Sequence, residues 1–472
     1  MVAPPPDDAS KDELRELVMK LIDVTNAQAR EIEELKAKLK KDSGNSSKPP
    51  SSDAPWSKRR RGRSPASGKK QGGQPGHEGA SRDLFDTSTV NGVEDHHATA
   101  CPSCGGSDLE PIARPPVRHQ VVDVPLLPAE VTEHRRHRGR CRTCGTAVLA
   151  PLPVSVPRSS FGPRLSALVA ELTGVFRLSR RETARFCEDA FGVEMSVGSV
   201  AAIERRMAAG LAPAHEEALA AARSCAVLHV DETPWKLRGA LRWLWTATAG
   251  TVTAFRIDER RSFEALKRLI GEAYAGRVVS DRMGAYDKLP IERRQICWAH
   301  LDRDMRALAE GHPGERDFGK TALSITKSIF RSWRAFLVHD DRERLRVELL
   351  PSWEKLLTHL ADGAASPERR VSALSCHLLD RADALWSFAD HPGVDPTNNA
   401  AERSVRKAVL WRKGSFGSQS EIGCRFVERI LTVTATLRQQ GRGVLEYLVA
   451  VANAPLLGTP PPALIAAPAL PG

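Results

Sequence analysis

Three acidic residues stand where their carboxylates could act together. Asp231 and Asp281 each follow a short apolar run, and Glu402 lies near the start of an amphipathic stretch. Carboxylate oxygens are the ligands that Mg²⁺ and Mn²⁺ prefer. Two such ions about 4 Å apart can activate an attacking oxygen and stabilise the leaving oxygen during in-line attack on phosphorus. We therefore predict that Asp231, Asp281 and Glu402 are catalytic and hold two Mg²⁺ or Mn²⁺ ions.

The elements that must position these acids belong to a mixed α/β domain. Five short runs of apolar, branched or aromatic residues are typical of strands. They are 225–230, 241–248, 251–257, 277–280 and 295–298. Helical stretches follow the third and fourth runs, and this order is that of an RNase H-like fold, in which the first and fourth strands are neighbours. Asp231 and Asp281, which close those two strands, should meet at one end of the sheet, with Glu402 on the flank of a later helix.

Each acid also has an ordinary structural interpretation. Asp231 and Asp281 could cap turns, and Glu402 could pair with Arg406 one helical turn later. Neighbouring acids compete for the same roles: Glu232, Asp287, Asp302 and Asp304. Two acids on adjacent predicted strands and a third on a following helix nevertheless favour a common site.

Polar and basic residues near these acids could support the site. His300 could orient the scissile strand, although an ordinary structural role for it is an open alternative. A basic set after Glu402 could contact phosphates. Its members are Arg403, Arg406, Lys407, Arg412 and Lys413.

Four of the nine cysteines form two pairs with the spacing of metal ligands. Cys101 and Cys104, like Cys141 and Cys144, are followed by glycine, which lets the backbone turn so that its amides face the thiolates. Four sulfurs predict a structural Zn²⁺ site, because a tetrahedral ion with four protein ligands has no open position. We expect two strands between the pairs, at 117–124 and 131–137. Nearby histidines are alternative ligands: His96, His97, His119, His134 and His137.

Basic charge points to nucleic acid as the partner. The 472 residues include 69 lysines and arginines against 58 acidic residues, for a net charge of +11, which suits a polyanion. Two basic runs are candidate DNA contacts, with a solubilising linker and a solvated strand as their alternatives. They contain Lys58, Arg59, Arg60 and Arg61, and Arg135, Arg136 and Arg138. Residues 179–191 and 197–209 have a helix-turn-helix outline, although plain helical packing explains it equally well.

These features predict a multidomain chain. Leucines at helical spacing over 11–40 indicate a leucine-zipper-like coiled coil, or else a solvated helix that packs on its own protein. The remaining expected segments run in order along the chain. They are a flexible basic linker at 41–95, a zinc-ribbon-like module at 96–150, a helical region at 158–222, the catalytic domain at 223–430 with a helical insertion at about 305–395, a helical segment at 431–454, and a disordered tail at 455–472. No run is long and apolar enough to span a membrane, so we expect a cytoplasmic protein.

Several motifs together resemble the insertion sequence 66 family of bacterial transposases, over nearly the whole chain. They are NSSKPPSSD at 45–53, GGQPGHEG at 72–79, CPSCGG at 101–106, CRTCG at 141–145, HVDETPW at 229–235, SDRMGAY at 280–286, CWAHLDRDM at 297–305 and TNNAAERSVRKAVLWRKGSFGS at 397–418. The resemblance implies an RNase H-like core with Asp231, Asp281 and Glu402 as a DDE triad, a zinc-binding DNA-recognition domain and a leucine zipper. It also implies that the chain binds the terminal inverted repeats of its element, acts as a homo-oligomer, and has small accessory proteins as further partners.

Two other functions are compatible with some of these motifs. A transposase-derived regulator would bind DNA ends without cutting them, but it would have no need for three converging acids. A nuclease of the same fold would cleave DNA without joining it, and it would have no need for the additional recognition modules. The sequence therefore favours a transposase.

Overall fold

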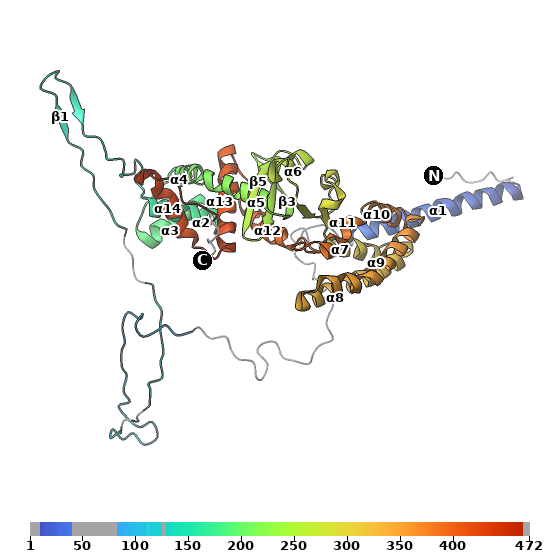
Figure 1. The fold of residues 1–472 in the computed structure, drawn as a ribbon, viewed down its shortest axis with the longest axis horizontal. Coiled ribbons are helices and arrows are strands. Elements are labelled where there is room, and N and C mark those ends of the chain that lie inside the picture. The colour runs from blue at the N-terminus through green and yellow to red at the C-terminus, as the bar shows by residue number, and fades with distance from the viewer. Residues whose placement is uncertain (1–9, 40–82, 111, 113, 125–128, 466–472) are drawn as a thin grey trace. The chain divides into compact units, whose positions relative to one another are not determined.

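The structure is a computed structural model that describes residues 10–39, 83–110, 112, 114–124 and 129–465 (Figure 1). Its internal contacts divide the chain into two units, 58–130 and the remainder, and each is described by itself. The predicted basic run 58–61 and most of the predicted linker lie outside the described residues. Among the described helices, none has the length and apolar character needed to cross a membrane.

Five strands form one mixed sheet in the order β5-β4-β3-β6-β7. They are β3 Val227–Leu237, β4 Ala240–Ala249, β5 Val252–Asp258, β6 Arg277–Ser280 and β7 Arg294–Ile296. The first three are antiparallel, whereas β6 runs parallel to β3 and β7 runs parallel to β6. The first and fourth strands of the domain are therefore neighbours, as the sequence predicts.

Helix α13, Glu421–Gln439, covers the edge strand β5. The backbone N–H groups of Thr253 and Phe255 donate to the hydroxyls of Thr436 and Thr432, at 3.1 and 2.9 Å. The backbone N–H of Ile257 donates to the carboxylate of Glu428. Acceptors four residues apart on the helix thus match donors two residues apart on the strand. The helix satisfies an edge that would otherwise be open to pairing with another chain.

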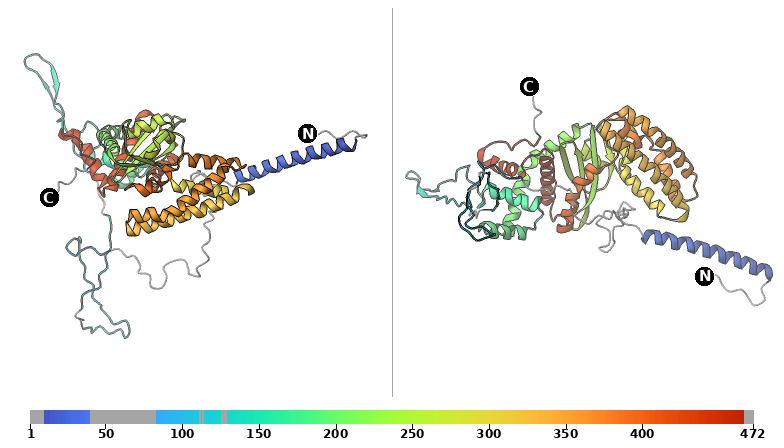
Figure 2. Two further views of the ribbon diagram at one scale, coloured as in Figure 1. Left: turned by 45° about the vertical axis from the view of Figure 1, so that its right-hand side comes forward. Right: turned by 90° about the horizontal axis from the view of Figure 1, so that it is seen from below.

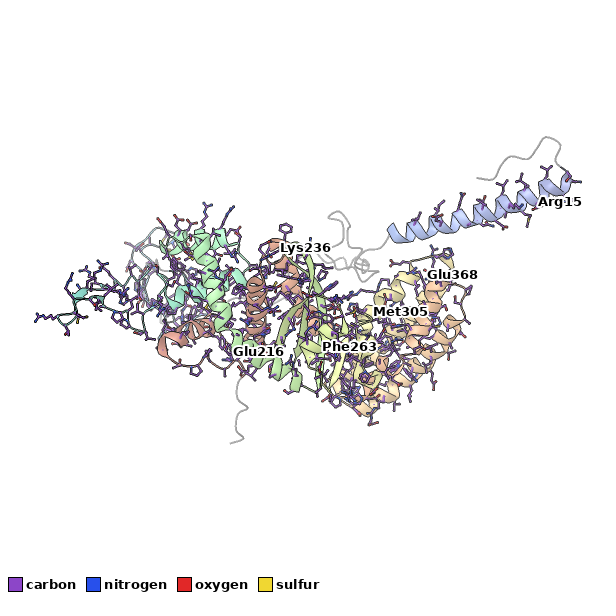
Figure 3. All side chains as sticks on the ribbon, turned by 90° about the horizontal axis from the view of Figure 1, so that it is seen from above. Arg15, Glu216, Lys236, Phe263, Met305 and Glu368 are labelled. Atoms are coloured by element: carbon purple, nitrogen blue, oxygen red, sulfur yellow. The ribbon has the colours of Figure 1, made fainter. Side chains whose placement is uncertain are left out.

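A helical insertion follows β7 (Figure 2), and its apolar core includes Val279 of β6 and Ile296 of β7. Its helices are α7 Trp298–Ala309, α8 Pro313–His339, α9 Arg342–Ala364, α10 Arg369–Leu379 and α11 Asp383–Asp390. Trp386 is buried and packs edge-on against Trp353, with ring centroids 4.6 Å apart. Met305, which Figure 3 labels, is buried on α7 and accepts a hydrogen bond from Thr326 of α8.

Helices that precede the sheet in the sequence pack with a helix that follows it, on the β5 side of the sheet (Figure 1). They are α2 Pro163–Gly174, α3 Arg180–Phe191, α4 Val197–Gly210, α5 Ala212–Ser224 and α14 Val444–Leu457. Ser179 and Glu182 form a reciprocal capping box at the start of α3, and Gly192 ends the helix at a φ of 66°. Residues 192–196 then join α3 to α4, which is the helix-turn-helix outline that the sequence predicts.

The N-terminal segment forms one continuous helix, α1 Lys11–Leu39. Several of its apolar side chains are exposed, with 42% of Leu14, 45% of Leu21 and 50% of Leu35 accessible to solvent. The pairing of this helix with another helix stays a prediction.

The two strands expected between the cysteine pairs are absent from the described residues, so that prediction is wrong. Residues 117–124 and 131–137 form no strand, and a small hairpin made of β1 Arg138–Arg140 and β2 Ala147–Leu149 surrounds the second pair instead. Val117 and Val131 are at least 90% exposed. Alternating valines produce a strand only where one face is buried, and here no apolar layer covers them.

The predicted disordered tail is also wrong for the residues that the structure describes. Helix α14 continues to Leu457, and Leu464 is completely buried. The backbone N–H of Leu464 donates to the carboxylate of Glu217 at 2.8 Å, and the Tyr447 hydroxyl donates to the Pro462 carbonyl at 2.8 Å. The composition, rich in proline and alanine, is typical of disorder and carries no signal of these long-range contacts. Residues 466–472 lie outside the described residues.

Candidate active site

Asp231 lies inside its strand, which corrects the expectation that it closes the strand. β3 pairs with β6 only as far as His229, opposite Val279, whereas its pairing with β4 continues past Asp231 to Leu237. The β3–β4 hairpin closes at Arg238 and Gly239, whose φ angles of 50° and 82° are those that a tight two-residue turn requires. Asp231 therefore stands where the neighbouring strand β6 has ended.

Asp281 and Glu402 come from the two segments beside this position. Asp281 directly follows β6, and its carboxylate accepts a hydrogen bond from the Met283 backbone N–H at 2.9 Å. Glu402 lies in the first turn of α12, Asn399–Ser415. That helix packs on β3 and β4 with Ala401 and Ala408 completely buried. The topology of the sheet thus brings three distant acids to one region.

The charge of this region is unbalanced. Burial raises the pKa of Asp231 well above its ordinary value, and the negative charges of Glu232, Asp281 and Glu402 raise it further. The Asp231 carboxylate accepts a hydrogen bond from the Glu232 backbone N–H at 2.9 Å. Within the described residues, no ion pair joins Asp231 to a cation. A divalent cation would supply the positive charge that the surrounding side chains do not provide.

Arginines partly neutralise the other two acids. Glu402 Oε1 lies 3.2 Å from Arg303 Nη2, and Asp281 Oδ2 lies 3.8 Å from Arg261 Nη2. Sequence reasoning singled out neither arginine, because pairing across separate elements leaves no local spacing signal.

The acids that compete with the triad in the sequence all have partners of their own. Glu232 is paired with Arg261 and accepts a hydrogen bond from the Tyr286 hydroxyl at 2.6 Å. The other three pair with arginines at 2.7 Å: Asp287 with Arg294, Asp302 with Arg306, and Asp304 with Arg282. These contacts give the competing acids structural roles, whereas Asp231, which is partly buried, pairs with no cation among the described residues.

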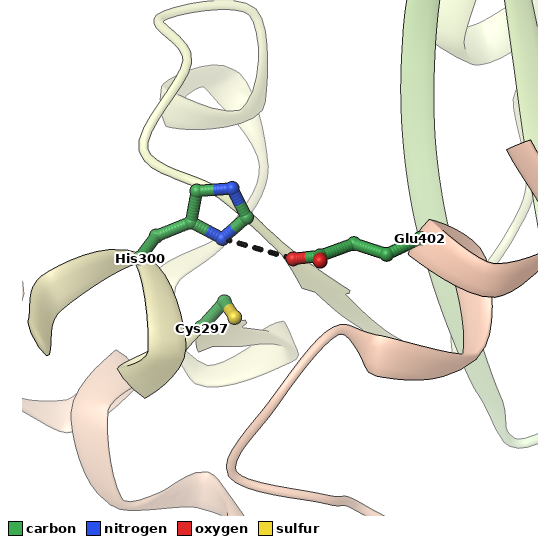
Figure 4. A group of neighbouring side chains, drawn as sticks. All are labelled: Cys297, His300 and Glu402. Carbon is green, nitrogen blue, oxygen red and sulfur yellow. Dashed lines mark ion pairs between the residues drawn. The ribbon is translucent and has the colours of Figure 1, made fainter. Parts of the chain in front are cut away.

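His300 lies beside Glu402, as its predicted supporting role requires (Figure 4). Its Nδ1 atom is 3.5 Å from Glu402 Oε1, and ligand atoms of Cys297, His300 and Glu402 all lie within 4.8 Å of one another. Burial, followed by the charge of Arg303, lowers the pKa of His300 and favours the neutral ring. Burial raises the pKa of the Cys297 thiol to about 11, and its sulfur accepts a hydrogen bond from the Asn398 backbone N–H at 3.1 Å. The thiol therefore acts as a neutral acceptor in this arrangement.

Each cysteine pair forms the same local turn. In the first pair, the Gly105 N–H donates to the Cys101 carbonyl at 2.8 Å, and in the second the Gly145 N–H donates to the Cys141 carbonyl at 2.9 Å. Both glycines have a positive φ, 74° and 77°. Backbone N–H groups of the turn point at the first sulfur of each pair; they lower the pKa of Cys101, and they lower that of Cys141 to about 7. Each turn suits a metal-bound thiolate.

The predicted DNA-contacting residues are placed in different ways. Arg403 and Arg406 are exposed on α12, whereas Lys407 is half-buried, and this burial lowers its pKa. Near the β1–β2 hairpin, Arg138 is exposed, Arg135 pairs with Glu133, and Arg136 donates to the Ala150 carbonyl.

The chain matches known protein families along most of its length. A model described as the transposase IS66 family matches residues 158–425, which hold all three acids. The chain belongs to the IS66 family of transposases. The zinc-finger binding domain of transposase IS66 matches residues 98–145, and a family of unknown function matches residues 1–83. An uncharacterized protein of Sinorhizobium fredii, y4hP, is 26% identical over 379 residues, covering 72% of this chain and 67% of that protein.

Family membership accounts for the domain order of this IS66 transposase, and the structure adds residues that sequence reasoning missed. Asn398 and Cys297 lie in two of the motifs that carry the resemblance. Their neighbours Glu402 and His300 were singled out because an acid and a histidine have obvious chemistry. A buried amide and a buried thiol show their role only through long-range hydrogen bonds.

Proposed function

We propose that this IS66 transposase binds the terminal inverted repeats of its insertion sequence and catalyses metal-dependent DNA cleavage and strand transfer. Asp231, Asp281 and Glu402 are the proposed catalytic residues and metal ligands. The observation that carries the proposal is that Asp231, a partly buried acid, is surrounded by the negative charges of Glu232, Asp281 and Glu402, with no cation paired to it in the described residues.

The strand arrangement supports an RNase H-like catalytic core. A three-stranded antiparallel meander, β3 to β5, is followed by β6 and β7 as parallel strands on the far side of β3. The acids come from the first strand, from the end of the fourth, and from a later helix. The predicted order of acids and elements agrees with this topology.

The three carboxylates form a hard oxygen donor set that suits Mg²⁺ or Mn²⁺. Two such ions would activate the attacking oxygen and stabilise the leaving oxygen on phosphorus. The protein's own part is to hold the acids: Arg303 and His300 lie against Glu402, and the Met283 N–H orients Asp281. Exposed Arg403 and Arg406 lie on the same helix as Glu402 and can contact DNA phosphates.

The recognition parts of the proposal lie in the first half of the chain. Cys101, Cys104, Cys141 and Cys144 would hold one structural Zn²⁺ ion in the family's zinc-finger domain. The basic residues around this domain and the α3–α4 pair are the proposed DNA-reading surfaces. Self-association through α1 and small accessory proteins of the same element are further proposed partners.

Strand transfer by the purified chain tests the proposal directly. The reaction would contain DNA with the element's ends, Mg²⁺ or Mn²⁺, and wild type or one of Asp231→Asn, Asp281→Asn and Glu402→Gln. Each triad variant should bind the ends but lose cleavage and joining by on the order of 1000-fold, because several kcal/mol of transition-state stabilisation depend on the ions.

A matched acid on a neighbouring helix provides the control. Asp302 pairs with Arg306 on the same helix, so Asp302→Asn removes a carboxylate near the site without touching the triad. This variant should retain strand transfer within a few-fold of wild type. If the triad variants behave like Asp302→Asn, the catalytic assignment is wrong. If wild type binds the ends but never cuts them, the chain is a DNA-binding regulator instead.

A further inference from the structure

We propose that Asn398 and Cys297 are positioning residues that hold the backbones of all three acids in one arrangement. This inference rests on the proposed function, because it assumes that Asp231, Asp281 and Glu402 share metal ions. The two residues are termed the Asn398–Cys297 bracket.

Asn398 links the strand of Asp231 to the helix of Glu402. It is 1% exposed and directly precedes α12, yet its side chain does not cap that helix. Instead, Nδ2 donates to the carbonyl of Val230 at 2.7 Å, one residue before Asp231. The backbone carbonyl of Asn398 accepts from the N–H of Glu402 at 3.1 Å. One buried residue therefore contacts the backbones that carry two of the acids.

Cys297 links the same point to the strand of Asp281. It is completely buried at the start of α7, and its backbone N–H donates to the carbonyl of Ser280 at 2.8 Å, one residue before Asp281. Its sulfur accepts from the Asn398 N–H at 3.1 Å. A second backbone bond, from the Trp298 N–H to the Pro396 carbonyl at 2.8 Å, supports the same junction.

The bracket thus meets the chain next to each acid. Val230 and Ser280 directly precede Asp231 and Asp281, and Glu402 follows Asn398 by one helical turn. The segments come from distant parts of the chain, and the pairing of β3 with β6 ends at His229 and Val279, before the two acids. Metal ligands must be placed within fractions of an ångström, and residues that orient them commonly affect metal affinity by 10- to 100-fold. If Asn398 and Cys297 only filled the core, apolar side chains of similar size could replace them. Such side chains would not form the hydrogen bonds to the Val230 carbonyl and from the Asn398 N–H.

The side-chain arm of the bracket is tested by Asn398→Ala with a matched control. Asn453→Ala removes a similar amide-to-carbonyl bond, from Asn453 Nδ2 to Val449 O at 3.1 Å, but within the single helix α14. Strand transfer would be measured across a Mg²⁺ titration, with the melting temperature of each variant recorded. Asn398→Ala should raise the Mg²⁺ concentration for half-maximal activity by about 10-fold or more, whereas Asn453→Ala should leave it unchanged.

The thiol arm is tested by Cys297→Ala and Cys297→Ser. Serine keeps an acceptor for the Asn398 N–H and alanine does not, so alanine should shift the Mg²⁺ requirement in the same direction as Asn398→Ala and serine should restore most of it. Cys187→Ala is the control, because Cys187 is equally buried on α3, far along the chain from the triad. If Asn398→Ala does not fold, the two Cys297 variants test the bracket on their own.

The outcomes separate the bracket from the proposed function. A shifted Mg²⁺ requirement in Asn398→Ala and Cys297→Ala, but not in their controls, supports the bracket. Wild-type Mg²⁺ titrations in both variants overturn it, even if their melting temperatures fall. Retained strand transfer in Asp231→Asn would instead overturn the proposed function, whatever the bracket variants do.

Discussion

At the scale of single residues, Asp231 combines burial with negative neighbours, and both raise its pKa. A group whose pKa is raised by folding contributes stability below its unfolded pKa, and this contribution is lost as the pH rises through the folded pKa. As the pH rises above the ordinary pKa of an aspartate, the metal-free protein therefore loses stability, because the surroundings of Asp231 disfavour its negative charge. Bound cations would offset that charge, so the same residue explains both a stability cost and a metal requirement.

Asp231→Asn should consequently stabilise the metal-free protein while abolishing activity. With a chelator present, the melting temperature of the variant should exceed that of wild type, and the difference should grow as the pH is raised from about 4, the ordinary pKa of an aspartate, to neutral pH. Added Mg²⁺ should raise the melting temperature of wild type more than that of the variant. Thermal denaturation across pH, with and without Mg²⁺, measures both effects. A variant less stable than wild type at the upper pH would contradict this account.

Glu428 offers a second pH test away from the triad. It is completely buried on α13, and burial raises its pKa to about 7 from an ordinary value of 4.5. Its stabilising contribution is present below about 4.5 and lost as the pH rises through about 7. Glu428→Gln should remove up to about 3 kcal/mol of the pH dependence of unfolding over that window. Denaturant unfolding at several pH values measures it, with the exposed Glu421→Gln on the same helix as control.

At the scale of elements, the end of α12 stores backbone strain. Phe416 ends this helix with a φ of 57°, in the left-handed region, although its ring is 77% exposed. The next residue, Gly417, has a φ of 101°, and an added Cβ there would collide with the Lys236 carbonyl oxygen. The turn returns the chain to β3, where Ser418 pairs with the Lys236 carbonyl at 2.8 Å.

Replacing the two residues of this turn should have opposite effects. Phe416→Gly should stabilise the protein by about 0.5–1 kcal/mol, because glycine adopts the left-handed conformation without strain and little packing is lost. Gly417→Ala should destabilise it, since both its φ and the Lys236 carbonyl oppose a Cβ. Denaturant unfolding of the two variants measures the difference. Equal effects would show that the turn is not strained.

At the scale of the whole molecule, the zinc-finger domain and the catalytic sheet are built from separate stretches of sequence. The family's zinc finger matches residues 98–145, and all five strands of the catalytic sheet lie after residue 226. Recognition and catalysis should therefore respond to different substitutions.

Cys141→Ser should reduce the bound zinc from one ion per chain towards none, because a site with three thiolates holds the metal less tightly. Specific binding of the element's ends should weaken, while the melting transition of the catalytic unit stays near that of wild type. Metal analysis and end-binding assays measure the two effects. Full zinc content in the variant would show that the four cysteines do not share an ion.

Self-association should depend on the apolar face of α1. Leu21→Glu combined with Leu35→Glu places charges on two half-exposed positions of that face, where a coiled-coil seam excludes them. Light scattering should give a multimeric mass for wild type and a smaller mass for the double variant. The control pair Lys20→Glu and Arg15→Glu changes charge on the same helix without removing an apolar residue. An unchanged mass in the leucine variant would assign assembly to another surface.

The sequence by itself determined that the first and fourth strands are neighbours and that each cysteine pair forms a turn, and it singled out the three acids that we propose as catalytic residues. These features depend on local patterns: apolar runs ended by acids, and cysteines two residues apart before a glycine. The same kind of pattern misled at 117–124, where valines alternate without a layer to cover them. It misled again in the tail, where Leu464 is buried by residues distant in sequence.

Only the tertiary structure decided which acids form ion pairs with arginines, how far β3 extends past Asp231, and which residues connect the three segments that carry the acids. Arg261, Arg303, Cys297 and Asn398 act through partners far along the chain. Hydrogen bonds and ion pairs of this kind depend on the folded path of the backbone rather than on spacing within one element. For that reason the proposed catalytic acids could be singled out from the sequence, whereas the contacts between the segments that carry them could not.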